Sequence, residues 1–228
     1  MVRVVFFDID GTLVHTGRAG MKAFAQVFSS EFKAHNGIEQ MKFGGRTDVS
    51  LVREFFRIHN IKTSAANFDR FFDRYVFWLD HIIKESAGAP CRGILDFLDE
   101  LGALPDPPLL GLLTGNIRLG AEIKLRHFDM WDLFVTGGFA DDHEDRNQIA
   151  ATAFKRSRLI LGKNLKPEEV LVVGDTPRDI ECGRYIGAKV LAVATGGATL
   201  AELKEHEPDW AVQDLRELRA RAVCNGAV

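Results

Sequence analysis

Short apolar runs, each followed by polar or glycine-rich residues and then by a helical pattern, recur along the chain. The runs are rich in leucine and β-branched residues and do not alternate with polar ones, which is typical of strands buried on both faces. The predicted strands are Val2–Phe7, Leu109–Leu113, Val170–Val173 and Val190–Val193, with weaker candidates at Phe134–Thr136, closed by Gly137 and Gly138, and at Trp210–Val212. From about residue 90 onward this order indicates repeated β-α units. It therefore predicts an α/β fold, a parallel sheet core with helices on both faces.

A long helical segment separates the first two predicted strands. About 100 residues lie between them, far more than one crossover helix requires. Within it, apolar residues at helical spacing form a stripe of Phe68, Phe71, Phe72, Tyr75 and Leu79. The chain would leave the sheet near Val14–Gly17 and return at the breaker segment Ser86–Pro90. We therefore expect a sheet domain of residues 1–14 and 90–228, with an inserted α-helical domain of residues 15–89.

Phenylalanine is unusually frequent, and most of it lies in the insertion. The chain has 17 Phe beside 2 Tyr and 3 Trp, and ten of the 17 fall between Phe24 and Phe77. Large rings fill a small core efficiently. Core packing is therefore the first explanation of the surplus, and some of these rings are also candidates for the roof of a site.

Charge and composition exclude several classes of protein. The 29 basic and 32 acidic residues give a net charge of -3, without the positive excess that nucleic-acid binding requires. No apolar run approaches the roughly 18 residues of a membrane span, and the run Val4–Phe7 is too short for a signal peptide. The three cysteines have no spacing typical of a zinc site or a redox pair. These features favour a cytoplasmic protein with reduced thiols and with neither nucleic acid nor membrane as its partner.

Acidic and hydroxyl side chains stand where three of the predicted strands end. Asp8 and Asp10 follow the first strand, Thr114 follows the second, and Asp175 and Asp179 follow a later one. Taken singly, each group could be a turn, a helix cap or a favourable partner of a helix dipole. Together they bring hard oxygen ligands to the edge of the sheet where ligands bind in open α/β folds. Carboxylates without His or Cys favour Mg²⁺ over zinc, and Mg²⁺ beside phosphate-holding amides indicates phosphoryl chemistry.

These motifs resemble those of the haloacid dehalogenase-like hydrolase superfamily. Asp8–Thr12 matches its Asp-x-Asp-x-Thr nucleophile loop, Thr114 its Thr or Ser after the second strand, and Gly174–Asp179 its Gly-Asp-x-x-x-Asp acidic motif. The resemblance covers nearly the whole chain, and the motifs are highly specific as a set. The helical insertion is similar to the small cap of the phosphoglycolate phosphatase and β-phosphoglucomutase branch. A Rossmann-like core with an inserted α-helical cap is what the resemblance implies.

The resemblance also implies a two-step transfer. Asp8 would attack phosphorus and become an aspartyl-phosphate, while Asp10 would protonate the leaving oxygen and later deprotonate the attacking water. Mg²⁺ would be held by the side chains of Asp8 and Asp175 and by the backbone carbonyl of Asp10, with Asp179 supporting it directly or through water. Thr114 and nearby backbone amides would hold the phosphoryl oxygens. The further residues expected to bind substrate are Gly11, Thr12, Gly115, Asn116 and Arg46.

The sequence departs from the family pattern at one position. The family places a lysine before the acidic motif to neutralise the nucleophile and the phosphate. Where Lys-Pro usually opens a helix, this chain has Arg146, and Lys155 further along the same helix is the alternative. Arginine keeps the positive charge but presents a planar fork instead of a point ammonium. We expect Arg146 to occupy this catalytic place.

The choice of activity depends largely on Asp10. A phosphomonoester leaving group needs a proton, and dehalogenases of this family usually lack an acid at that position. The first interpretation is therefore Mg²⁺-dependent hydrolysis of a small phosphorylated metabolite, for which the resemblance suggests phosphoglycolate. A β-phosphoglucomutase-type phosphomutase is the alternative, although the histidine that mutases tend to carry early in the cap is missing from Gly17–Met21. A non-catalytic phosphate-binding protein is a further alternative, supported only by the missing lysine.

A glycine-rich loop in the insertion offers a candidate for substrate specificity. Arg46 lies in the loop Gly44–Asp48, which precedes a predicted cap helix. It could reach a substrate carboxylate or second anion, or it could be an exposed residue near a helix start. Arg18 is a weaker candidate of the same kind.

Overall fold

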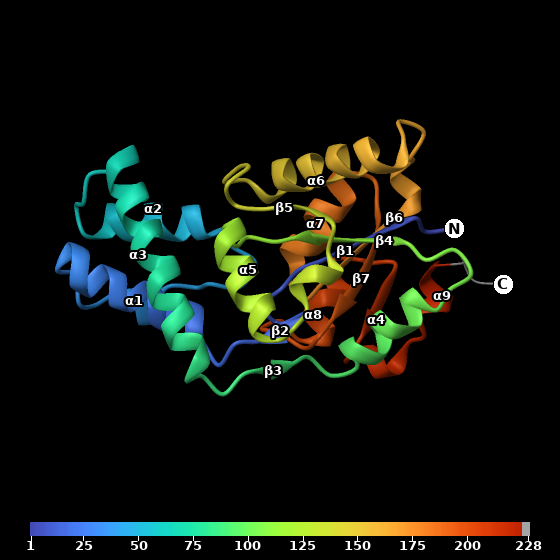
Figure 1. Cartoon of the computed structure of the whole chain (residues 1–228), viewed down its shortest axis with the longest axis horizontal. Coiled ribbons are helices and arrows are strands. Elements are labelled where there is room, and N and C mark those ends of the chain that lie inside the picture. The colour runs from blue at the N-terminus through green and yellow to red at the C-terminus, as the bar shows by residue number, and fades with distance from the viewer. Residues whose placement is uncertain (225–228) are drawn as a thin grey trace.

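Six parallel strands form the sheet in the computed structural model, which describes residues 1–224 (Figure 1). Their order across the sheet is β5-β4-β1-β6-β7-β8. The strands are β1 (Val4–Phe7), β4 (Leu109–Leu113), β5 (Thr136–Gly138), β6 (Val170–Gly174), β7 (Lys189–Val193) and β8 (Trp210–Val212). Because β1 lies between β4 and β6, the loops that follow these three strands meet at one edge of the sheet.

Helices cover both faces of this sheet. One face is covered by α6 (Arg146–Leu161), α7 (Pro177–Tyr185) and α8 (Leu200–Glu205), and the other by α4 (Ile94–Gly102), α5 (Arg118–His127) and α9 (Ala220–Cys224). Along β1, Val4 and Phe6 pack toward the first set of helices, whereas Val5 and Phe7 pack toward the second. Both faces are therefore apolar, which explains the uninterrupted apolar run in the sequence. The predicted α/β fold is confirmed.

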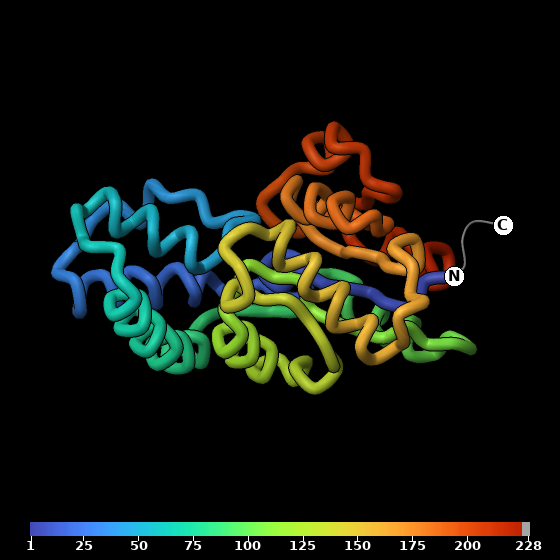
Figure 2. The backbone as a smooth tube through the Cα atoms, turned by 90° about the horizontal axis from the view of Figure 1, so that it is seen from above, coloured from blue at the N-terminus to red at the C-terminus, as the bar shows by residue number. Residues whose placement is uncertain are grey.

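The inserted segment forms a separate group of helices at one end of the sheet (Figures 1 and 2). It contains α1 (Ala19–Phe32), α2 (Asp48–Ile58) and α3 (Ala65–Lys84), with a short 3₁₀ turn at Ile38–Gln40. The two connections to the sheet pair with each other as antiparallel strands, β2 (Val14–His15) and β3 (Ala89–Pro90). The division into residues 1–14 with 90–228 and residues 15–89 remains a prediction of the domain limits. Three further 3₁₀ turns lie at Trp131–Leu133, Pro167–Glu169 and Leu215–Glu217.

Aromatic rings fill the interior of the helical cap. The rings of Phe28 and Phe55 stack with their centroids 3.5 Å apart, and Phe24 meets Phe71 edge to face at 4.9 Å. Of the predicted stripe, Phe71, Tyr75 and Leu79 are fully buried, while Phe68 and Phe72 are partly buried against them. Most of the phenylalanine surplus therefore builds a compact core between three helices.

Some element boundaries differ from the sequence prediction. The first strand begins at Val4 because the backbone N–H of Val2 donates instead to the carbonyl of Cys224. The weaker strand expected at residues 134–136 lies at 136–138, so its two glycines belong to the strand. Helix α6 explains the second glycine: a Cβ at Gly138 would lie 2.8 Å from Ile149 Cγ2, so only glycine allows this close approach. In the described part of the chain, no helix is long and apolar enough to cross a membrane.

Candidate active site

Strand β1 delivers two carboxylates to the edge of the sheet. The backbone N–H of Asp8 donates to Val173 O at 3.0 Å, which extends the pairing of β1 with β6 by one residue. The chain then turns at Gly11, whose φ is +91°. A Cβ at Gly11 would lie 2.7 Å from Asp175 Oδ2. Glycine at this position therefore permits both the turn and the close approach of Asp175.

Three buried carboxylates converge beside this turn. Ligand oxygens of Asp8, Asp175 and Asp179 all lie within 4.8 Å of one another. The hydroxyl of Thr12 donates to Asp175 Oδ1 at 3.1 Å. At the start of α7, the N–H and the hydroxyl of Thr176 donate to Asp179 Oδ2 at 3.0 and 2.6 Å. The capping box of α7 therefore fixes the third carboxylate.

Arg146 is the cation of this cluster. It lies at the first position of α6, is buried, and donates through Nη2 to Asp8 Oδ1 at 3.3 Å and to Asp179 Oδ1. The same nitrogen lies 3.4 Å from the carbonyl oxygen of Leu113. Lys155, two turns further along α6, is exposed. The structure thus places Arg146, and not Lys155, against the predicted nucleophile.

Burial and like charge oppose ionisation of the clustered acids. Desolvation, together with the neighbouring Asp179, raises the pKa of Asp8 from 3.8 to about 7, although Arg146 lowers it. Desolvation and the charges of Asp8 and Asp179 raise the pKa of Asp175 well above its usual value. Burial acts to lower the pKa of Arg146, but Asp179 and Asp8 outweigh it and raise that pKa, so the guanidinium stays charged. One cation therefore faces three carboxylates.

The donor set of this cluster fits a hard divalent cation. Its ligand atoms are carboxylate oxygens, which Mg²⁺ prefers, and neither His nor Cys contributes to the cluster. A dication would also relieve the excess negative charge that Arg146 leaves uncompensated. The residues whose side chains could hold it are Asp8, Asp175 and Asp179. The predicted metal site, which also includes the backbone carbonyl of Asp10, stays a prediction.

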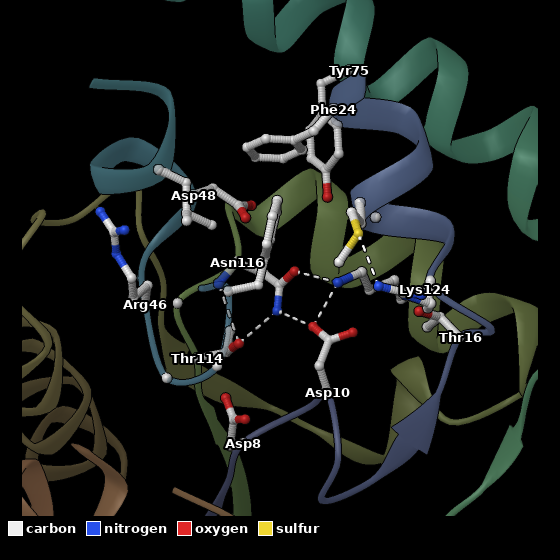
Figure 3. A pocket seen from close by; sticks show the side chains of 18 of the residues that line it. Asp8, Asp10, Thr16, Phe24, Arg46, Asp48, Tyr75, Thr114, Asn116 and Lys124 are labelled. Atoms are coloured by element: carbon white, nitrogen blue, oxygen red, sulfur yellow. Dashed lines mark hydrogen bonds and ion pairs between the residues drawn. The ribbon is translucent and has the colours of Figure 1, made fainter. Parts of the chain in front are cut away.

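Asp10 points away from these acids into a polar network. Its Oδ2 accepts from Asn116 Nδ2 at 2.9 Å and from Lys124 Nζ at 2.6 Å (Figure 3). Asn116 also donates to Thr114 Oγ1 at 2.8 Å and accepts from Lys124 at 2.6 Å. Two strand-end motifs that lie about 100 residues apart in the sequence are thereby joined, with Asp10 Oδ1 left out of the network.

Sequence reasoning did not identify Lys124. Its side chain is only 5% exposed, although lysine is rarely buried without a partner. A signal was present, because Lys124 falls on the same face of α5 as the buried residues Ala121 and Leu125. A charged residue within an apolar helical stripe indicates a buried partner, here Asp10.

The cap closes over the sheet through the loop that precedes α2. The backbone N–H of Asp48 donates to Gly115 O at 2.7 Å, and Asp48 Oδ2 accepts from the N–H of Ile117, just before α5, at 2.9 Å. Thr47 Oγ1 donates to Glu144 O at 3.0 Å. These contacts hold the cap loop directly against the strand-end loop that carries Thr114.

Arg46 is oriented differently from the prediction. Its guanidinium turns away from the cavity, pairs with Glu54 and donates to the carbonyl oxygen of Ser50 at 3.1 Å (Figure 3). Both partners lie on α2, so the first turns of that helix hold this side chain. The Arg46 side chain is 19% exposed, so it is not the exposed residue of the alternative either, and substrate binding by Arg46 stays a prediction.

One cavity of about 200 Å³ unites most of the predicted site residues. It is lined by Asp8, Asp10, Thr16, Arg18, Gly20, Met21, Phe24, Phe43, Gly44, Gly45, Arg46, Asp48, Leu51, Tyr75, Thr114, Gly115, Asn116, Lys124 and Arg146. Gly11 and Thr12 are not among these residues and instead position Asp175. Two rings of the phenylalanine surplus, Phe24 and Phe43, do reach the roof of the cavity.

Several known proteins are similar to the chain in sequence or in fold. Pyrophosphatase PpaX of Oceanobacillus iheyensis is 26% identical over 234 residues, covering 95% of each chain. The crystal structure of CbbY from Rhodobacter sphaeroides in complex with xylulose-(1,5)bisphosphate matches with a TM-score of 0.74 at 17% identity, over 96% of each chain. A predicted phosphoglycolate phosphatase from Haemophilus somnus 129PT matches with a TM-score of 0.72 at 19% identity, again over 96% of each chain.

The family is settled by a match along most of the chain. Residues 5–193 match the model of the haloacid dehalogenase-like hydrolases. This range contains the nucleophile loop, the second-strand threonine and the acidic motif, all of which the structure brings to one edge of the sheet. The chain therefore belongs to the haloacid dehalogenase-like hydrolase family.

Proposed function

We propose that the protein is a Mg²⁺-dependent phosphatase that hydrolyses small organic phosphomonoesters through an aspartyl-phosphate on Asp8. The observation that carries this proposal is the position of two carboxylates at one cavity. Asp8 borders the cavity and also belongs to the buried acid cluster, whereas Asp10 borders the same cavity but is bonded to Lys124 and Asn116. Two acids from one loop thus lie in different environments, as a nucleophile and an acid-base group require.

In the first step, a carboxylate oxygen of Asp8 attacks phosphorus and the bond to the leaving oxygen breaks. Asp10 donates a proton to that oxygen, so the leaving group departs as a neutral alcohol. Positive charge from Arg146, which contacts Asp8 directly, opposes the negative charge that gathers at the phosphoryl group. Thr114 and Gly115 border the same cavity as Asp8, and we propose that they hold phosphoryl oxygens.

In the second step, water attacks the phosphorus of the aspartyl-phosphate. Asp10, now ionised, accepts a proton from this water, and the bond between Asp8 and phosphorus breaks. Phosphate is released and both carboxyl groups return to their starting states. Mg²⁺ held by Asp8, Asp175 and Asp179 would supply the charge that favours ionised Asp8 and that offsets the charge of the phosphoryl oxygens.

The direct test is hydrolysis of p-nitrophenyl phosphate by the purified protein, with Mg²⁺ or with EDTA. We expect turnover that requires Mg²⁺ and that Asp8→Asn abolishes, because the amide cannot form the acyl-phosphate. Asp69→Asn, which changes an exposed acid on α3, serves as the matched control and should behave like the wild type. Acid-quenched wild-type protein should carry a phosphoryl group on Asp8. Full activity in Asp8→Asn would refute the proposal.

Inorganic pyrophosphate is the second candidate substrate. The observation that favours it is the similarity to pyrophosphatases over nearly the whole chain. Release of phosphate from pyrophosphate, measured beside a panel of phosphomonoesters at equal concentrations, separates the two candidates.

A further inference from the structure

The cavity extends from Asp10 into the cap, where nothing in the proposed chemistry uses its lining. Its walls there are largely apolar, with Phe24, Phe43 and Leu51 among the lining residues. Two polar groups interrupt these walls: the hydroxyl of Tyr75 on α3 and the carboxyl group of Asp48 on α2 (Figure 3). This compartment is the space into which the leaving group of a substrate on Asp8 would extend.

The hydroxyl of Tyr75 faces the cavity and has no hydrogen-bond partner in the described part of the chain. The residue is only 1% exposed, and its ring packs against Phe24 with centroids 4.8 Å apart. Within residues 1–224 its oxygen makes no hydrogen bond, and it points into the cavity (Figure 3). A Cβ at Gly20 would lie 3.6 Å from this oxygen and 3.5 Å from Lys124 Nζ. Gly20 thus leaves space beside both groups, and the Tyr75 hydroxyl is free to donate to or accept from a ligand in the cavity.

Asp48 presents the second polar group to the same compartment. It is only 7% exposed, and its Oδ2 accepts a hydrogen bond from the N–H of Ile117, so Oδ1 remains available to a ligand. Desolvation raises the pKa of Asp48 from 3.8 to about 7, with Lys124 acting in the opposite direction. Near neutral pH the group can therefore accept a hydrogen bond when ionised or donate one when protonated.

The charges around this compartment disfavour a second anion. Lys124 donates hydrogen bonds to Asp10 and Asn116, and Arg46 forms an ion pair with Glu54. Among the described cations that line the cavity, Arg18 has no carboxylate partner, but it is exposed and its Nη2 contacts only Met21 Sδ at 3.5 Å. A phosphate or carboxylate inside the compartment would instead face Asp48.

We propose that Tyr75 and Asp48 form a hydroxyl-binding subsite for the leaving group, so that the preferred substrates are phosphomonoesters of small uncharged polyols. This inference rests on the proposed function of Asp8 and Asp10 and names the substrate class for the same site. Tyr75 and Asp48 supply one or two hydrogen bonds, the aromatic walls cover the carbon atoms, and the compartment selects against a diphosphate.

The test compares glycerol 3-phosphate with n-propyl phosphate, which differ only in two hydroxyl groups. We expect kcat/KM of the wild type to favour glycerol 3-phosphate at least tenfold, and to favour it over pyrophosphate as well. Tyr75→Phe should lower the preference about fivefold, which corresponds to one net hydrogen bond. Tyr185→Phe changes the other tyrosine of the chain, which is 54% exposed, and should leave the preference unchanged.

Binding measured by calorimetry in the Asp8→Asn background, which is expected not to turn over, keeps the test independent of turnover. The affinity ratio of the same two ligands should show the same fivefold change in Tyr75→Phe, and Asp48→Asn should also change the ratio. The proposal is overturned if Tyr75→Phe affects both ligands equally, if water alone occupies the subsite so that no preference exists, or if pyrophosphate is the better substrate. Absent hydrolysis of p-nitrophenyl phosphate would count against the proposed function, whereas the affinity ratio would still decide this inference.

Discussion

Replacing Arg146 by methionine tests whether the acid cluster depends on its buried cation. Nη2 of Arg146 lies 3.3 Å from Asp8 Oδ1 and also pairs with Asp179, and the side chains of all three residues are at most 8% exposed. Methionine fills much of the same space without the charge. The change therefore leaves three mutually repelling carboxyl groups in a buried site.

Removing one partner of a buried ion pair costs about 3–5 kcal/mol, because the remaining charge is left without compensation. For a chain of this length such a loss lowers the melting temperature by about 10 °C. Arg146→Lys keeps the charge but not the planar fork, so we expect roughly half of that loss. Lys155→Met, on the exposed side of the same helix, should stay within about 0.5 kcal/mol of the wild type.

The assay is thermal or urea unfolding in EDTA and again in Mg²⁺. A ligand at about 100 times its dissociation constant stabilises a protein by about 2.7 kcal/mol. We expect Mg²⁺ to stabilise Arg146→Met more than the wild type, because the variant has one cation fewer among its carboxylates. If Arg146→Met and Lys155→Met were equally stable in EDTA, or if Mg²⁺ acted identically on wild type and Arg146→Met, this account of the cluster would be refuted.

Two further predictions concern the cavity. Lys124→Met should lower kcat/KM about tenfold more for an alkyl phosphate than for p-nitrophenyl phosphate. The reason is that p-nitrophenolate leaves without a proton, so its release depends less on a well-placed Asp10. An equal loss for both substrates would contradict a role of Lys124 through Asp10. For Asp48, burial raises the pKa in the folded protein from the usual 3.8 to about 7, so the folded protein binds an extra proton between these values. Its contribution to stability is therefore complete below about pH 4 and is lost as pH rises through 7, by up to about 4 kcal/mol. Relative to Asp48→Asn, metal-free wild type should lose about 2.6 kcal/mol of that stability between pH 5 and pH 8 in urea unfolding. Parallel pH profiles of the two proteins would contradict the prediction.

Local patterns in the sequence were sufficient for the sheet and for its acidic edge. An uninterrupted apolar run identified β1, and the acids that follow it had to lie at the carboxyl edge, because parallel strands all end there. The same reasoning placed Asp175 and Thr114 near Asp8. The resemblance to the family favoured Arg146 over Lys155, because Arg146 stands where the family's lysine opens a helix.

Patterns failed where a residue's role depended on a distant partner. The two glycines of β5 were expected to close the strand, and only the tertiary structure shows that Gly138 allows the close approach of α6. Arg46 resembled a substrate ligand, but Glu54 on the neighbouring helix turn binds it. In both cases the sequence shows which residue is present, but the neighbour that determines its role is known only from the folded structure.

By itself, then, the sequence determined the α/β sheet, the order of its strand-end motifs and the acids at its edge, because apolar runs and the helical spacing that follows them are local patterns. Only the tertiary structure decided that Lys124 bonds Asp10 and that Tyr75 and Asp48 face the same cavity. These side chains come from α5, α3 and α2, and the rotation of each helix about its axis is set by packing between cap and sheet. No short stretch of sequence encodes that rotation. The reactive groups could therefore be predicted from the sequence, whereas the residues that form the walls of the substrate compartment could not.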